Sequence, residues 1–402
     1  MQSRSIILYP DAHGVARGKI VCGNTDARIE IGCASGVFSK DIYGNPQLFD
    51  TLATPSGAAD IRVLASDAAV WKVNPRADAL FGASSLFIGA VTNVDSQPHP
   101  LDFRSILADY IEANPNLDRF RIGGELEFFL RPVNPDAALR SDGQAYALSG
   151  ASLRHECLEA MLSILDDVGI AWTGLSQENT EDQYEISLRH GTLLEQADSL
   201  FLARFLLRHV AAVHGLRCTF VPVIDKGGAP GNLHLHVSDT KTAEINHLVT
   251  SAFSALEGSL LAFCPTCNSR LVSQLESFSS KSINAGHGHR FKAVRIVNDG
   301  ESTRIELRTP TSDANPYLAF LVLAGHFNTC SQPLPLDALM EKDTPIDWDF
   351  GASISAFRKD AVVNSVLSTR SVELFSELKR LEAMASDKYS FAEETLAMMT
   401  VL

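Results

Sequence analysis

Apolar and polar positions form two kinds of pattern along the chain, and the change between them falls near residue 97. Before it, short runs such as Ser5–Tyr9, Lys19–Cys22 and Arg28–Ile31 alternate with turns that contain glycine, proline or asparagine. Such runs predict short strands. The segment Pro98-His99-Pro100 then marks a boundary, which predicts an N-terminal domain over residues 1–97 and a larger domain over residues 98–402.

The second region combines strands with strong helical patterns. Ser152–Val168 carries its apolar residues on one stripe and is followed by Gly169, which predicts a helix that ends there. Thr192 and Glu195 have the spacing of a capping box, and the helix that they begin runs to Gly215.

Further elements follow in the C-terminal half of the chain. We expect strands over Leu216–Ile224 and Leu233–Val237, a helix capped by Asn315 with Pro316 at its first position, and helices from about Ser368 onwards. The strands are too short, and too polar on one face, for a parallel sheet buried on both sides. The sequence therefore predicts an α+β fold built on an antiparallel sheet.

Composition and charge exclude several classes of protein. With 402 residues, 45% hydrophobic and 20% charged, the chain has the composition of a globular protein with a sizeable core. A net charge of −14 argues against nucleic acid as the main partner. No apolar run approaches the length of a membrane span or a signal peptide. Seven scattered cysteines favour reduced thiols and a cytoplasmic location over a disulfide framework.

Four strand-like segments each present charged or imidazole side chains on one face. In Arg304-Ile305-Glu306-Leu307-Arg308 the charged residues alternate with apolar ones, so all three share a face. Taken alone, such a strand is more often half-buried with its charges in solvent, and a single histidine is more often a core residue. The residues that the four segments offer are Glu125, Glu127, Glu178, Glu185, His234, His236, Arg304, Glu306 and Arg308.

Gathered on one sheet, these groups would need counter-charges. Five glutamates brought together repel one another, and burying them uncompensated is costly. Oxygen donors with an imidazole favour Mg²⁺ or Mn²⁺ over Zn²⁺. Metal among carboxylates, with arginines that include Arg290 and Arg295, suits chemistry on nucleotide phosphates. The chain has neither a P-loop nor a strand followed by GxGxxG, so those nucleotide-binding routes are unsupported.

Six motifs, in order and spread over most of the chain, resemble those of the glutamine synthetase superfamily. They are GGELEFFL (123–130), ENTEDQYEISL (178–188), TFVPV (219–223) with HLHVS after it, NSRLVSQLE (268–276), HRFKAVRI (289–296) and RIELRTPTSDANPYLA (304–319). The resemblance implies a small N-terminal β-grasp domain and a large catalytic domain with a curved antiparallel sheet. It also implies a homo-oligomeric ring, a dodecamer or similar, whose active sites lie between subunits.

The resemblance also implies roles for individual residues, with two or three Mg²⁺ or Mn²⁺ ions per site and ATP as co-substrate. Metal ligands by motif are Glu127, Glu178 and Glu185 for one ion, and Glu125, His234 and Glu306 for another. Nucleotide-binding positions are His236, Ser238, Arg295 and Arg304. Catalytic positions are Arg290, Arg308 and Glu276, the last being the loop glutamate that accepts the amine's proton. Arg270 and Arg308 match residues that hold the acid substrate.

Departures from the family's pattern bear on the substrates. Where the family has Asn-Gly-Ser-Gly before the metal histidine, this chain has Ala229-Pro230-Gly231-Asn232, and Glu181-Asp182-Gln183 replaces Pro-Gly-Gln. The segment from Asp11 to Lys19 looks like the branch that ligates amines larger than ammonia, such as γ-glutamylpolyamine synthetases. The leading expectation is an ATP-dependent ligase of glutamate and an amine. Alternatives are glutamine synthesis from ammonia, a different acid substrate, and a catalytically silent structural or regulatory relative.

Overall fold

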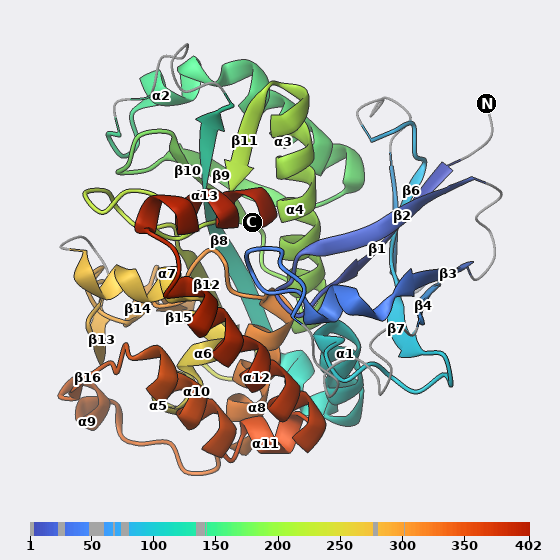
Figure 1. Cartoon of the computed structure of the whole chain (residues 1–402). Helices are drawn as coiled ribbons and strands as arrows, with labels where there is room; N and C mark the ends of the chain where they lie inside the picture. Colours follow the sequence, from blue (N-terminus) through green and yellow to red (C-terminus); the bar gives the residue numbers. More distant parts are fainter. Residues whose placement is uncertain are drawn as a thin grey trace.

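The computed structural model describes residues 4–22, 29–47, 60–66, 69–73, 80–133, 141, 143–275, 280–300 and 302–402. Two small sheets make up the N-terminal part (Figure 1). One has the strand order β2-β1-β6-β5, with bounds Ala16–Cys22, Arg4–Pro10, Ser85–Ile88 and Val70–Lys72. The other has the order β3-β4-β7, with bounds Ile29–Ala34, Asp60–Ala65 and Ala90–Asn93. β1 pairs parallel with β6 and antiparallel with β2.

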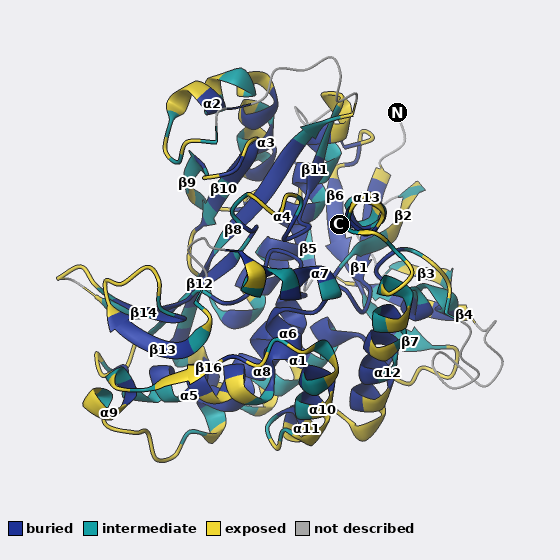
Figure 2. Cartoon of the chain, turned by 60° about the vertical axis from the view of Figure 1, so that its left-hand side comes forward, coloured by how far each residue is buried: buried dark blue, intermediate teal, exposed yellow. Residues whose placement is uncertain are grey.

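A nine-stranded sheet is the centre of the larger part. Its order is β16-β13-β14-β15-β12-β8-β10-β9, and β11 also pairs with β8. In that order the bounds are Asp343–Pro345, Ser282–His287, Val294–Asn298, Thr303–Leu307, Leu233–Asp239, Phe120–Pro132, Gln183–Leu188 and Trp172–Gln177, with Leu216–Thr219 for β11. The long central strand β8 is largely buried, as Figure 2 shows.

Helices pack around this sheet. The first seven among the described residues are α1 (Phe103–Ala113), α2 (Leu148–Leu153), α3 (His155–Val168), α4 (Leu193–Val213), α5 (Asn246–Gly258), α6 (Leu260–Phe263) and α7 (Cys267–Arg270). The later ones are α8 (Pro316–Thr329), α9 (Leu336–Met340), α10 (Phe350–Lys359), α11 (Val363–Val366), α12 (Thr369–Ser386) and α13 (Phe391–Val401). α8 is apolar on nearly all sides because it contacts α1, α4 and α5 and so lies in the core.

Most expected elements are present at or near their predicted bounds. The α+β fold class is confirmed. The capping box of Thr192 and Glu195 begins α4, Gly169 ends α3 in the left-handed conformation, and the Asn315 side chain accepts a hydrogen bond from the Tyr317 N–H. The domain boundary at residues 97–98 falls between β7 and α1 and stays a prediction.

Three expectations about secondary structure were wrong in detail. The helix over residues 152–168 is broken at Arg154, whose guanidinium donates to Asp182 Oδ1 at 3.1 Å. The strand from Leu216 ends at Thr219, because the next amide, of Phe220, donates to the Leu402 carbonyl instead of a neighbouring strand. The large sheet contains one parallel pair, β13 with β14, among antiparallel ones.

Two broader expectations can be compared with the structure. All seven cysteines are free thiols, as predicted. Within the described ranges, no helix combines the length and apolar character needed to cross a membrane.

Candidate active site

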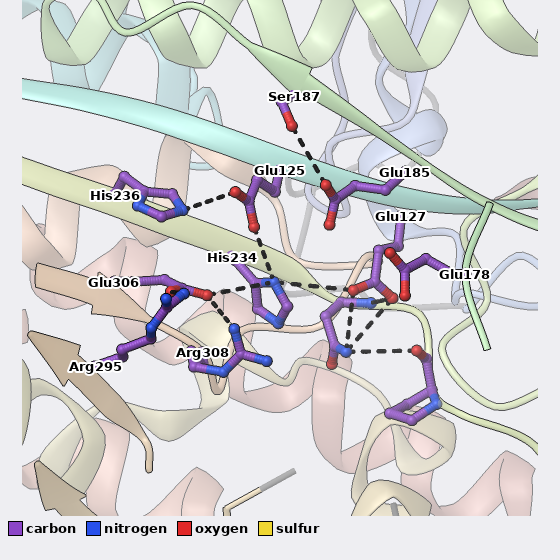
Figure 3. A network of polar contacts seen from close by, with 12 residues as sticks. Glu125, Glu127, Glu178, Glu185, Ser187, His234, His236, Arg295, Glu306 and Arg308 are labelled. Carbon is purple, nitrogen blue, oxygen red and sulfur yellow. Dashed lines mark hydrogen bonds and ion pairs between the residues drawn. The ribbon is translucent and has the colours of Figure 1, made fainter. Parts of the chain in front are cut away.

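Strand pairing brings the predicted acidic and imidazole residues onto one face of the large sheet. β8 lies between β12 and β10, and its Glu125 is opposite His234 while its Glu127 is opposite Glu185. On the other side of β12, His236 is opposite Glu306 of β15. Glu178 follows directly after β9. Residues more than 180 positions apart in the chain therefore meet, as Figure 3 shows.

Two groups of these side chains have the spacing of a metal site. Glu125, Glu185 and His234 each offer a ligand atom within 4.8 Å of the others, and so do Glu125, His236 and Glu306. Glu125 belongs to both groups. The resemblance had placed Glu125 with His234 and Glu306, and His236 with the nucleotide. The geometry thus links the same residues in a different combination, with Glu125 at the centre.

The carboxylates of the first group and its surroundings repel one another. Burial, reinforced by the charge of Glu178, raises the pKa of Glu127 to about 8. Burial and the charge of Glu125 raise the pKa of Glu178 to about 7. The pKa of Glu185 is also raised well above its ordinary value, by burial and then by its three neighbouring glutamates. A site of buried oxygen donors that must bind protons to relieve repulsion fits a hard divalent cation.

Histidine and arginine side chains compensate the other two carboxylates. Burial raises the pKa of Glu125, but hydrogen bonds from His234 and His236 outweigh it and lower that pKa overall. Burial likewise raises the pKa of Glu306, yet the charges of His234 and Arg308 lower it overall. Glu306 accepts hydrogen bonds from Arg308 and, at 2.8 Å, from Arg295 Nη1 (Figure 3). One part of the sheet face therefore holds glutamates that repel one another, and the other part holds glutamates whose charge is balanced by histidine and arginine.

Arg304 and His236 form a chain of hydrogen bonds that ends at Glu125. Arg304 Nε donates to His236 Nδ1 at 3.2 Å, which leaves the ring proton on Nε2. His236 Nε2 then donates to Glu125 Oε1 at 2.9 Å. Arg304 also pairs with Asp299 at 2.7 Å. His236 thus orients the carboxylate that both donor groups share.

Glu127 is held by the loop that departs from the family's pattern. Gln183 Nε2 donates to Glu127 Oε2 at 2.8 Å, and the Asn232 amide N–H donates to the same oxygen at 3.1 Å. Gly231 lets the loop approach Ser312 and Phe129 closely, because a Cβ there would lie 2.7 Å from Ser312 Oγ. Asn232, one of the altered residues, therefore helps to hold a carboxylate of the acidic face.

A cavity of about 350 Å³ opens onto this face. Arg290, Arg295 and Arg308 line it together with all the predicted metal ligands except Glu306, which lies beneath two of those arginines. Arg304 and Ser238 lie outside the lining. Arg270 also lies outside it, buried with its guanidinium 5.2 Å from the centre of the Phe350 ring. Glu276 lies outside the described residues.

Sequence reasoning missed several residues of this cavity. Asn179, Ala145 and Tyr146 line it, and Tyr146 stands at the mouth with 65% of its side chain exposed. Its φ of 65° is unusual for a residue with a side chain. The three residues directly before Tyr146, Gly143-Gln144-Ala145, carry neither a charge nor a periodic pattern. Only the position of this segment beside β9, fixed by a hydrogen bond from the Tyr146 N–H to the Gln177 carbonyl, brings it to the site.

A family model described as "Glutamine synthetase, catalytic domain" matches residues 102–396. The match covers most of the chain and the whole of the site just described, so the chain belongs to the glutamine synthetase family.

Curated relatives are consistent with this membership. The chain is 22% identical over 340 residues to a glutamate–isopropylamine ligase of a Pseudomonas species, covering 74% of this chain and 73% of the relative. It is 26% identical over 377 residues to γ-glutamylputrescine synthetase PuuA of Escherichia coli, covering 83% and 77%. It is 27% identical over 322 residues to a glutamine synthetase of Pyrococcus abyssi, covering 72% of each. These relatives confirm the predicted resemblance to the family and to its γ-glutamylamide branch.

Solved structures share the fold over nearly the whole chain. A structure described as a novel glutamine synthase homolog has a TM-score of 0.82 at 19% identity and covers 100% of this chain and 99% of its own. A structure described as GmaS without ligand has a TM-score of 0.77 at 20% identity, covering 98% and 96%. At these identities the likeness concerns the fold, including the small N-terminal sheets and the large sheet.

Proposed function

We propose that this protein is an ATP-dependent ligase that joins the γ-carboxyl group of glutamate to an amine other than ammonia. The observation that carries the proposal is the acidic cavity that Arg290, Arg295 and Arg308 line together with the glutamates. An anionic wall that needs cations, facing a group of fixed guanidinium ions, suits transfer of a phosphoryl group from a nucleotide. Family membership supports the coarser statement, ligation of glutamate with ammonia or an amine at the expense of ATP.

The proposed reaction has two steps. In the first, a γ-carboxylate oxygen of glutamate attacks the terminal phosphorus of ATP, which forms an acyl phosphate and releases ADP. In the second, the amine nitrogen attacks the acyl carbon, phosphate leaves, and the amine gives up a proton. Phosphorylation turns a poor leaving group into a good one. Glu276 is the proposed acceptor of the amine's proton.

Arginines would orient and stabilise the anions in both steps. Arg308 already contacts Glu306 and lines the cavity, so it can hold an acid substrate beside the acidic face. Arg290 and Arg295 can take phosphate oxygens, since guanidinium forks match them in geometry and charge. Ser238, His236 and Arg304 are the proposed nucleotide contacts, and Arg270 a proposed contact of the acid substrate.

Mg²⁺ or Mn²⁺ would be held by the acidic face. The proposed ligands are Glu125, Glu127, Glu178, Glu185, His234 and Glu306. Bound there, the ions would neutralise the phosphate oxygens. The raised pKa values of Glu127 and Glu178 support this assignment, because a cation relieves the same repulsion that protons relieve in its absence.

The choice of an organic amine rests on two observations. Two relatives, which cover 74% and 83% of this chain, are named glutamate–isopropylamine ligase and γ-glutamylputrescine synthetase. The segment from Asp11 to Lys19, which looks like that of the branch that ligates larger amines, points the same way. Ammonia remains the second candidate, because glutamine synthetases of similar identity are also relatives.

The altered loop also bears on the identity of the acid substrate. In the altered loop, the Asn232 side chain lies 3.4 Å from a Glu127 oxygen and so is turned to the metal site instead of to a substrate's amino group. The acid should therefore be tested as a variable. We also propose the two-domain division at residue 97, a cytoplasmic location and a ring assembly with active sites between subunits.

Release of ADP from ATP, measured with Mg²⁺ or Mn²⁺ and a matrix of acids and amines, tests the proposal. The amines include ammonia, isopropylamine and putrescine at equal concentrations of free base, and the acids include glutamate. We expect release that depends on both glutamate and an organic amine. Greater release with ammonia would favour glutamine synthesis. No amine-dependent release with any acid would overturn the proposal and favour a silent relative.

A further inference from the structure

A second cavity, of about 590 Å³, lies away from the acidic face. It is enclosed by the turn between β1 and β2, by α4 and by the end of α13, which lie side by side in Figure 1. Its volume is that of a site for a small metabolite. None of the residues that line it lines the active-site cavity.

The lining of this cavity is positively charged. Arg17, Lys40, Arg204 and Arg208 contribute to it, together with His209, and no aspartate or glutamate of the described ranges does. This is unusual in a chain with a net charge of −14. Arg17 is compensated by an ion pair with Asp11 at 2.8 Å. Arg208 donates hydrogen bonds to the carbonyl groups of Thr400 and Val401, and no aspartate or glutamate of the described residues pairs with it.

Aromatic rings form the other part of the lining. The His209 ring lies 4.9 Å from that of Phe81 and 6.4 Å from that of Phe205, between centroids. Phe201 and Phe220 are fully buried at the floor. Phe81 is half exposed at the rim, with a φ of 54°. A ligand that fits must therefore combine a negative charge with an apolar or planar part.

Arg204 supplies a buried donor within this lining. Its side chain is 7% exposed, its Nη1 and Nη2 donate to the carbonyls of Ala314 and Ser312, and its Nε–H has no partner among the described residues. Burial lowers its pKa to about 10. Leaving a buried charged donor unpaired is costly, and an anion is the natural acceptor.

From these observations we propose that the second cavity binds a small organic anion, a carboxylate or phosphate attached to a planar or apolar group. The cationic side chains of the lining would hold the anion, and the aromatic rings would hold the remainder. This site is independent of the proposed ligase chemistry, since it shares no lining residue with the active site.

Hydrogen bonds connect the cavity to the active-site loop. Arg204 Nη2 donates to the Ser312 carbonyl at 2.6 Å, and the Ser312 N–H donates to the Gly231 carbonyl at 3.1 Å. The next residue, Asn232, holds Glu127. A ligand that draws Arg204 towards it would shift Ser312 and, through it, the loop that holds Glu127. Occupancy of the cavity should therefore change metal affinity at the active site.

Calorimetric titration of the full chain with four probes tests the site. Phenyl phosphate and benzoate carry both an anion and a ring, inorganic phosphate carries only charge, and benzyl alcohol carries only the ring. One of the first two should bind about tenfold more tightly than either partial probe. Which of them binds more tightly distinguishes phosphate from carboxylate. Equal affinity for all four would overturn the proposal.

Variants locate the binding. Lys40→Gln and Phe81→Ala change partly exposed residues of the cavity and should each weaken the better probe by about tenfold. Lys359→Gln removes an equal charge from the exposed end of α10 and should leave the affinity for the probe unchanged. Arg290→Gln removes a charge from the active-site cavity and should also leave the tight binding unchanged. Loss of binding in Arg290→Gln alone would place the probe in the active site and overturn the proposal.

Mn²⁺ affinity tests the connection without relying on catalysis. We expect saturation with the better probe to change the Mn²⁺ dissociation constant by about fivefold or more. Mn²⁺ should change the affinity for the probe by the same factor, because coupling between two sites is reciprocal. In Lys40→Gln the same changes should need about tenfold more probe. An unchanged Mn²⁺ affinity with the cavity saturated would disprove the connection while the binding site stands.

Discussion

The active-site cavity and the second cavity have linings of opposite charge, one acidic and one basic. The active-site cavity gathers glutamates on a sheet whose strands pair in a fixed register. The second cavity gathers arginines and a lysine where a turn, a helix and the end of the chain's last helix meet. In a chain of net charge −14, the acidic cavity agrees with the overall charge and the basic cavity departs from it.

The difference shows which kind of ligand each cavity requires. In the acidic cavity, burial and repulsion raise the pKa values of three glutamates, so protons or cations must balance the charge. In the basic cavity, Arg204 and Arg208 rely on backbone carbonyls, which supply partial charge only. A cation suits the first cavity and an anion the second.

The largest expected effect follows from replacing the carboxylate that both donor groups share. Glu125→Gln removes a negative charge without changing volume, and we expect Mn²⁺ affinity to fall by about a hundredfold or more. Turnover should fall with it. Glu373→Gln, the same change on an exposed residue of α12, is the matched control. Calorimetry that found equal Mn²⁺ affinity in both variants would contradict the metal assignment.

The pH dependence of stability should differ between metal-free and metal-bound protein. Because burial raises the pKa of Glu127 to about 8 and that of Glu178 to about 7, above an ordinary 4.5, the folded state keeps protons that the unfolded state releases. Their stabilising contribution is complete below about pH 4.5 and is lost as pH rises through 7 and 8. Mn²⁺ should offset this loss.

Thermal unfolding with and without Mn²⁺ measures this effect. The difference between the two unfolding temperatures should widen from about pH 5 to about pH 9. In Glu125→Gln it should stay small throughout. A difference that does not depend on pH would mean that these glutamates do not take up protons when the metal leaves.

The acidic cavity could be predicted from sequence because its residues follow strand periodicity. Glu125 and Glu127 are two residues apart, as are His234 and His236, and in a strand that spacing places both members of each pair on the same face. Strand order and register then decide which groups meet. The observed strand order brings Glu125 close to His236 and Glu306. These three residues lie on three different strands, so the residue spacing within any one strand could not predict that they meet.

The basic cavity, the end of β11 and the position of Tyr146 depend on tertiary contacts, which leave no periodic pattern in the sequence. Arg204 and Arg208 are one turn apart on α4, a pattern that also describes an ordinary helix, and they meet Lys40 only through packing of the N-terminal sheets. Strand β11 ends early because Phe220 bonds to the last residue of the chain. Tyr146 lines the active-site cavity, and its N–H donates a hydrogen bond to the Gln177 carbonyl at the end of β9.

A smaller effect is expected from crowding the loop that lies between the two cavities. In Gly231→Ala the new Cβ would lie 2.7 Å from Ser312 Oγ, so the loop must shift and loosen the hold of Asn232 on Glu127. We expect a loss of about 1–3 kcal/mol in the free energy of unfolding and weaker Mn²⁺ binding. Gly227→Ala in the same loop is the control, because its Cβ meets only Asp225 Oδ1, at 3.6 Å. Equal stability of the two variants would show that the loop can shift to accommodate the new Cβ without a loss of stability.

The smallest expected effect concerns the aromatic residue at the rim of each cavity. Tyr146 and Phe81 are both exposed and both have a positive φ, 65° and 54°, which costs about 1 kcal/mol for a residue with a Cβ. Phe81→Ala and Phe81→Gly remove the same ring, but only glycine relieves that strain. Chemical denaturation should therefore find Phe81→Gly at least as stable as Phe81→Ala, although glycine elsewhere usually destabilises, and both should bind phenyl phosphate equally weakly. If Phe81→Gly were the less stable of the two, the backbone at this rim would be unstrained, and the ring alone would account for its role in the basic cavity.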